Sequence, residues 1–129
     1  MKKLARAEFE IKNWDEKAYS EIPKLTRASI TKTYKGDLEG EGALEYLMAY
    51  SPDGSASFVG MERFVGGIGE KRGSFVFQHT GIFKDGIAKS TWSVVPNSGT
   101  DDLKSLRGEV DSALGHGKSY PVELHYEFV

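Results

Sequence analysis

The sequence contains no cysteine. This absence excludes disulfide cross-links, thiolate nucleophiles and cysteine metal sites. The sequence also lacks an apolar run long enough to cross a membrane, and its start, from Met1 to Arg6, has no apolar segment like that of a signal peptide. We therefore expect a cytoplasmic protein that does not associate with a membrane.

A strong charge of either sign is also lacking, because the formal net charge of the 129 residues is -2 at pH 7. Nucleic-acid binding needs a clustered positive surface, and the dense basic stretches are limited to Lys2-Lys3 and Lys71-Arg72. We therefore expect no nucleic-acid partner. Hydrophobic residues make up 39% and charged residues 28%, which is typical of a folded chain, and the length suits a single domain over residues 1–129.

Turn-forming residues recur between short segments in which apolar and polar side chains alternate. Examples are Ser51-Pro52-Asp53-Gly54, Lys35-Gly36-Asp37 and Lys84-Asp85-Gly86. Regular spacing of strand and turn predicts an all-β antiparallel meander that closes on itself as a barrel or a sandwich. The predicted strands, about eight in number, span residues 4–12, 25–34, 39–50, 55–65, 74–83, 87–95, 106–114 and 120–128.

Two segments fall outside this strand pattern. Residues 13–23 mix large apolar with acidic side chains, and we expect a long loop that crosses one end of a barrel. Residues 96–100 contain proline and glycine and break the pattern again. We expect Thr100 to cap a short helical turn over residues 100–104, because its hydroxyl can accept a hydrogen bond from a free backbone N–H group.

Turn geometry predicts which side chains share a face of the sheet. The proline turn before the fourth strand places Glu62 opposite Leu44 and puts Tyr46 and Phe58 on the same face. A two-residue turn before the third strand adds Arg27, opposite Tyr46. The register therefore gathers a carboxylate, a guanidinium and two aromatic side chains on one surface.

Such a surface has more than one interpretation. Glu62 and Arg27 among aromatic side chains would form a polar anchor inside an apolar pocket. Burial there should raise the pKa of Glu62, unless Arg27 lies close enough to offset it. The same two residues can instead form a structural ion pair, or this face can be solvated.

The predicted strand over residues 74–83 carries Gln78 and His79 beside apolar neighbours, and a two-residue turn at its end places His79 opposite Trp92. His79 is the histidine best placed to transfer a proton, although a core histidine held by a hydrogen bond fits the same position. No two histidines have the spacing of a metal site. We therefore expect no metal and no cofactor.

Seven motifs cover nearly the whole chain: KLTRA (24–28), GDLEGEG (36–42), EYLM (45–48), FVGMER (58–63), GSFVFQH (73–79), WSVVP (92–96) and SGT (98–100). Together they resemble a family of small bacterial proteins of unknown function whose fold is similar to the allene oxide cyclase barrel. That resemblance implies a closed eight-stranded antiparallel barrel, related in shape to lipocalins and dirigent proteins. It supplies no known activity. Allene oxide cyclases bind an oxidised fatty-acid epoxide and assist ring closure with a carboxylate, for which Glu62 is the counterpart by analogy of fold.

We therefore predict a barrel that binds a small apolar or amphiphilic ligand. The candidate ligand-binding residues are Arg27, Tyr46, Phe58, Glu62, Gln78, His79 and Trp92. Two alternatives stay open: an isomerase or cyclase of a lipid-like substrate, in which Glu62 or His79 moves a proton, and a structural barrel without a ligand. Apolar side chains on both faces of residues 75–77 favour a homo-oligomer, most simply a dimer.

Overall fold

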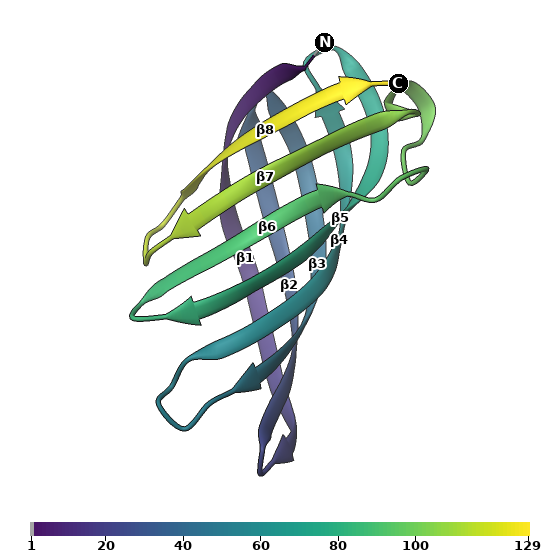
Figure 1. Ribbon diagram of the computed structural model, residues 1–129. Helices are drawn as coiled ribbons and strands as arrows, with labels where there is room; N and C mark the ends of the chain where they lie inside the picture. Colours follow the sequence, from purple (N-terminus) through teal and green to yellow (C-terminus); the bar gives the residue numbers. More distant parts are fainter. Residues whose placement is uncertain (1) are drawn as a thin grey trace.

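Strands with alternating apolar and polar side chains pair into one antiparallel sheet in the computed structural model, which describes residues 2–129 (Figure 1). Neighbouring strands follow in chain order and β1 pairs with β8, so the sheet closes as a barrel. The elements are β1 (Lys3–Glu21), β2 (Lys24–Gly36), β3 (Leu38–Tyr50), β4 (Ala56–Ile68), β5 (Lys71–Lys84), β6 (Ile87–Val94), the 3-10 helix η1 (Asp101–Leu103), β7 (Leu106–Leu114) and β8 (Tyr120–Phe128). The predicted all-β closed barrel with a short helical turn is confirmed.

The first strand, β1, is longer than predicted, because residues 13–21 continue it. The prediction of a long loop over residues 13–23 is therefore wrong. A bulge after Ile11 moves the inward positions from odd-numbered residues such as Phe9 to even-numbered residues such as Glu16. This shift breaks the alternation by which a strand is recognised in a sequence. The hairpin of β1 and β2 extends beyond the other hairpins at the lower end of the barrel (Figure 1).

Thr100 occupies the N-cap position of η1, as predicted, but its hydroxyl does not cap the helix. The hydroxyl accepts a hydrogen bond from the Ser74 backbone N–H at 3.0 Å instead. It also lies 2.8 Å from the Ser74 hydroxyl. Thr100 therefore fastens the corner before β7 to β5, because the nearby strand offers a better donor than the single turn of η1.

The pairing of β2 with β3 is one residue out of the predicted register. Arg27 lies opposite Leu47, not Tyr46, because Asp37 alone separates β2 from β3. Asp37 is held by β1: its N–H donates to the Arg6 carbonyl at 2.9 Å, and its carboxylate accepts from the Arg6 N–H at 3.0 Å. A shift of one residue exchanges the two faces of a strand. Arg27 therefore points outward, and the even-numbered residues of β2 point inward.

The two other predicted registers are confirmed. Glu62 lies opposite Leu44 in the β3–β4 pair. His79 lies opposite Trp92 in the β5–β6 pair. Both turns have the lengths that their proline, aspartate and glycine residues predict.

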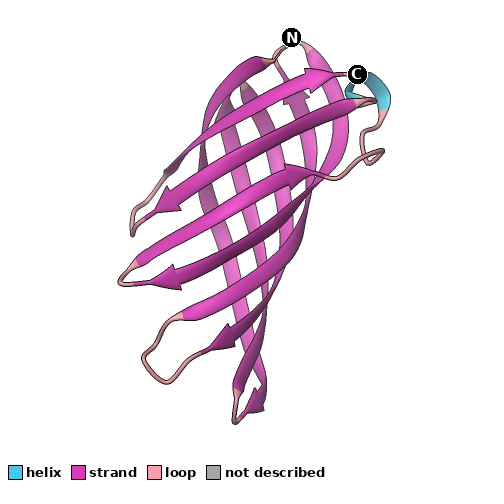
Figure 2. Ribbon diagram, viewed as in Figure 1, coloured by secondary structure: helices cyan, strands magenta, loops and turns pink. Residues whose placement is uncertain are grey.

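The interior has two unlike halves. One half of the barrel, here called the closed half, carries the chain termini and η1 (Figure 2). It is filled by one large cluster of buried side chains. Its members are Ala5, Ala7, Phe9, Tyr34, Leu38, Phe64, Ile68, Phe75, Phe77, Trp92, Val94, Leu103, Leu106, Val110, Val122 and Leu124. The half towards the β1–β2, β3–β4 and β5–β6 hairpins, here called the open half, holds two small clusters, Ala28 with Ile30 and Leu44, and Met48 with Ala56 and Phe58.

Candidate functional site

A cavity of about 410 Å³ occupies the open half. Its aromatic lining includes Phe9, Trp14, Tyr46, Tyr50, Phe58 and Trp92. Aliphatic side chains such as Leu44 and Ala88 also line it, and Lys32 brings an amine to this apolar lining. An apolar cavity with few polar groups is typical of binding sites for small molecules.

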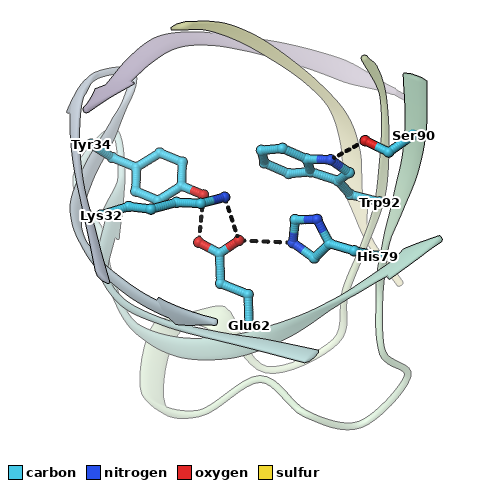
Figure 3. Close-up of polar contacts among 6 residues, drawn as sticks. All are labelled: Lys32, Tyr34, Glu62, His79, Ser90 and Trp92. Carbon is cyan, nitrogen blue, oxygen red and sulfur yellow. Dashed lines mark hydrogen bonds and ion pairs between the residues drawn. The ribbon is translucent and has the colours of Figure 1, made fainter. Parts of the chain in front are cut away.

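Four polar side chains form a buried cluster centred on Glu62 (Figure 3). The Oε1 atom of Glu62 accepts from Lys32 Nζ at 3.0 Å and lies 2.8 Å from His79 Nε2. The Oε2 atom accepts from the Tyr34 hydroxyl at 2.5 Å. Glu62 and His79 are both 0% exposed. The residues come from β2, β4 and β5, so the cluster joins three strands across the interior.

A glycine on β3 makes this arrangement possible. Lys32 lies opposite Gly42, and β3 stands between Lys32 on β2 and Glu62 on β4. A Cβ atom at Gly42 would lie 2.1 Å from Glu62 Oε2, closer than any van der Waals contact allows. Because Gly42 has no side chain, the carboxylate and its partners meet above it.

The cluster keeps Glu62 ionised despite its burial. Burial alone would raise the pKa of Glu62, but the charge of Lys32 and the hydrogen bonds from His79 and Tyr34 lower it to about 2. The expected partner Arg27 has no part in this effect. It lies on the outer surface, where its Nε donates to Glu45 Oε1 at 3.0 Å.

The His79 ring is neutral within the cluster. Burial lowers the pKa of His79, the Lys32 charge adds to this effect, and the hydrogen bond to Glu62 opposes it. A neutral imidazole facing a carboxylate must carry its proton on Nε2. The Nδ1 atom of His79 then has a free lone pair, and it has no hydrogen-bond partner among the described residues. A second proton on the ring would leave a buried N–H unpaired, which agrees with the neutral form.

A second polar group lies at the mouth of the cavity. The Glu16 carboxylate accepts hydrogen bonds from the Tyr50 hydroxyl, from Thr26 Oγ1 at 2.7 Å and from Trp14 Nε1 at 3.0 Å. These bonds fasten the long β1–β2 hairpin to β3. They hold Trp14, which is 45% exposed, with its ring centroid 6.3 Å from that of Tyr46. Trp14 therefore forms part of the rim.

Five of the seven predicted ligand-binding residues lie at this site. Tyr46, Phe58 and Trp92 line the cavity, and Glu62 and His79 lie in the cluster beside it. Whether they bind a ligand stays a prediction.

The other two predicted residues, Arg27 and Gln78, point outward and are exposed. The prediction that these two side chains lie in the interior is therefore wrong. Arg27 is misplaced by the register error in β2, and Gln78 lies on the outer face because its neighbour His79 points inward.

Sequence reasoning missed Lys32 and Tyr34, the two β2 residues of the cluster. Their signal was the alternation within β2 itself, since Ala28 and Ile30 share their face while the opposite face is polar. It also missed Trp14 at the rim, because the bulge in β1 conceals the strand.

A further hollow of about 780 Å³ runs over β5, β6 and β7. Its lining contains no aromatic side chain and consists largely of exposed residues such as Lys84, Asp85 and Lys89. We therefore place the candidate site inside the barrel.

Comparison with known proteins gives a family but no activity. A solved structure of a protein with unknown function from Shewanella oneidensis MR-1, assigned to the DUF3224 family, is 29% identical and has a TM-score of 0.84, and the match covers 100% of this chain and 99% of that chain. No protein with a curated description matches the sequence. Residues 5–126 match the model of the same family, described as proteins of unknown function. The chain therefore belongs to the DUF3224 family.

Proposed function

We propose that the protein binds a small, mainly apolar or amphiphilic molecule in the open half of the barrel. The observation that carries this proposal is the cavity of about 410 Å³, which lies within the size range of small-molecule sites. An empty apolar cavity reduces stability, because its walls lose packing contacts. A ligand that packs between Phe58 and Trp92 would restore those contacts.

The proposal is tested by titrating the protein with 2-naphthalenemethanol and following tryptophan fluorescence, since Trp14 and Trp92 both line the cavity. Ala88→Phe places a ring in the cavity and should abolish binding. Ala49→Phe is the matched control, because Ala49 is exposed on the barrel exterior. Binding that is absent in the wild type, or unchanged in the Ala88→Phe variant, would contradict the proposal.

The buried contact between Glu62 and His79 favours a second candidate, an isomerase or cyclase of a lipid-like substrate. Paired acid and base groups beside an apolar cavity suit proton transfer. The similarity to allene oxide cyclase barrels in fold belongs with this candidate. In that case Glu62→Gln should abolish turnover of an unsaturated epoxide while the fold survives, and an unchanged rate would exclude a role for this carboxylate.

Exposed apolar side chains on the outer face of β3, β4 and β5 favour a third candidate, a self-associating barrel. Leu47 and Val59 are each 50% exposed, Met61 is 52% exposed and Ile82 is 55% exposed. Sedimentation velocity should then show a dimer for the wild type and a monomer for Val59→Glu. A monomeric wild type would contradict this candidate.

A further inference from the structure

Lys32 is the one buried lysine among residues 2–129. Its side chain is 3% exposed, whereas Lys35 on the same strand is exposed. Stability alone does not require a lysine here, because replacing a buried ion pair by apolar residues is often neutral or stabilising. A buried lysine beside a cavity can instead serve a chemical role.

One carboxylate and two close aromatic rings surround the amine, and the Tyr34 ring centroid lies further away, 5.9 Å from Nζ. The Nζ atom of Lys32 lies 3.0 Å from Glu62 Oε1, 4.3 Å from the ring centroid of Phe9 and 4.5 Å from that of Trp92. Phe9, Lys32 and Trp92 all line the cavity. A ligand that packs against the two rings would bring its polar end next to Nζ.

The neutral amine form of Lys32 is more favoured in these surroundings than it is in water. Burial lowers the pKa of Lys32, although the charge of Glu62 and the hydrogen bond to it act in the opposite direction. Once Nζ loses its proton, the Lys32 charge no longer lowers the pKa of Glu62 and burial raises it, so the carboxylate that contacts Nζ can accept that proton. A desolvated lysine amine with a neighbouring base is a nucleophile for aldehydes and ketones.

We propose that Lys32 captures an aldehyde or ketone group of an apolar ligand as a Schiff base in the open half. This inference rests on the proposed function and names the reactive group of the ligand. Lys32 gives one proton to Glu62, and its Nζ lone pair then forms a bond to the carbonyl carbon while the π electrons of the C=O bond move onto the oxygen. A second proton then moves from nitrogen to the carbonyl oxygen, which gives a neutral carbinolamine.

Glu62 returns its proton to the carbinolamine hydroxyl, the C–O bond breaks, water leaves and a protonated imine forms. The overall reaction converts an ammonium group and a carbonyl into a protonated imine and one water. It needs no oxidant or reductant, and Glu62 ends in its starting state. Water reverses the same steps, so the capture is reversible.

Trapping with a reductant tests this proposal directly. The wild type is incubated with 2-naphthaldehyde and sodium cyanoborohydride, which reduces a protonated imine to a stable secondary amine. Intact mass and peptide mapping should show one naphthylmethyl group per chain, attached to Lys32. An excess of 2-naphthalenemethanol, which has the same rings but no carbonyl, should suppress the label by competing for the cavity.

Variants separate Lys32 from the surface lysines. Lys32→Met alone would leave Glu62 without its cation, so the double variant Lys32→Met, Glu62→Gln removes both charges together. It should lose the label, whereas Lys35→Met should keep it in full. The site of the label in the wild type decides the question even if a variant does not fold.

Two results would overturn the proposal, and they have different consequences. If 2-naphthalenemethanol binds and Lys32 remains unlabelled, capture by Lys32 is wrong while the proposed function stands. If the alcohol does not bind and any label is spread over surface lysines, both fail.

Discussion

The closed and open halves of the barrel share the same strands and the same alternation, but they differ in the size of their inward side chains. In the closed half, ring centroids lie 5.0 Å apart for Phe64 and Phe75 and 4.9 Å apart for Phe75 and Phe77. In the open half, small residues occupy inward positions near the hairpins, among them Ala28, Ala56, Ala88 and Ser90. An eight-stranded barrel is just wide enough to be filled by side chains or to hold one small ligand. Side-chain size therefore decides between the two outcomes within a single barrel.

The buried cluster lies where the two halves meet. The centroid of the His79 ring lies 4.4 Å from that of Trp92, which belongs to the large cluster and also lines the cavity. It lies 6.2 Å from the ring centroid of Phe77 in the closed half and 5.7 Å from that of Tyr46 on the cavity side. Three donors satisfy the Glu62 carboxylate within the protein. Internal hydrogen bonding lets charged groups border an apolar cavity at a tolerable cost.

Breaking the cluster should have the largest effect on stability. Lys32→Met leaves the Glu62 charge buried without its cation, and we expect a loss of about 3–5 kcal/mol in the free energy of unfolding. Adding Glu62→Gln should recover much of that loss. Arg27→Ala breaks an exposed pair and should cost about 0–1 kcal/mol. Urea denaturation measures all three, and a Lys32→Met protein as stable as the wild type would contradict the account.

Acid should expose the contribution of Glu62. Burial alone would raise its pKa, but Lys32, His79 and Tyr34 lower it from the ordinary 4.5 to about 2 in the folded protein. The stability it contributes is complete above pH 4.5 and is lost as the pH falls towards 2, because the unfolded chain takes up the proton first.

We expect the wild type to lose about 3 kcal/mol more over this range than the double variant Lys32→Met, Glu62→Gln. Urea unfolding at several pH values provides the comparison, and surface carboxylates titrate in both proteins. Equal losses would show that Glu62 is not held ionised by its partners.

Removal of one aromatic ring should destabilise the closed half more than the open half. Phe64 is 0% exposed within the closed half, and Phe64→Ala should cost about 3–5 kcal/mol. Phe58 lines an existing cavity, so Phe58→Ala should cost about 2 kcal/mol less. Denaturation midpoints give the difference. Equal costs would mean that the open half is as well packed as the closed one.

A methyl group at Gly42 should displace the carboxylate without removing any partner. Gly42→Ala places Cβ 2.1 Å from Glu62 Oε2, and we expect a loss of about 1–2 kcal/mol from the repositioned side chain. Gly115→Ala is the control, since a Cβ atom there meets nothing within 4 Å. Thermal unfolding of both variants measures the effect, and similar midpoints would show that the cluster tolerates movement.

The sequence predicted the barrel well because alternation and turn residues are local signals. Glu62 and His79 could be placed inside from the turns next to their strands. The cluster could not be completed, because the turn before β3 is held by Arg6 of β1, a contact distant in sequence. The predicted β2–β3 register was wrong by one residue. The prediction therefore placed Arg27 beside Glu62, whereas the cation found there is Lys32.

A crystal structure of the protein with saturating 2-naphthalenemethanol would show whether the open half binds a ligand. We expect the naphthalene rings in the open half, packed against Phe58 and Trp92, with the hydroxyl directed towards Lys32. A cavity that stays empty, or that is closed by movement of Trp14 and Tyr46, would contradict this expectation.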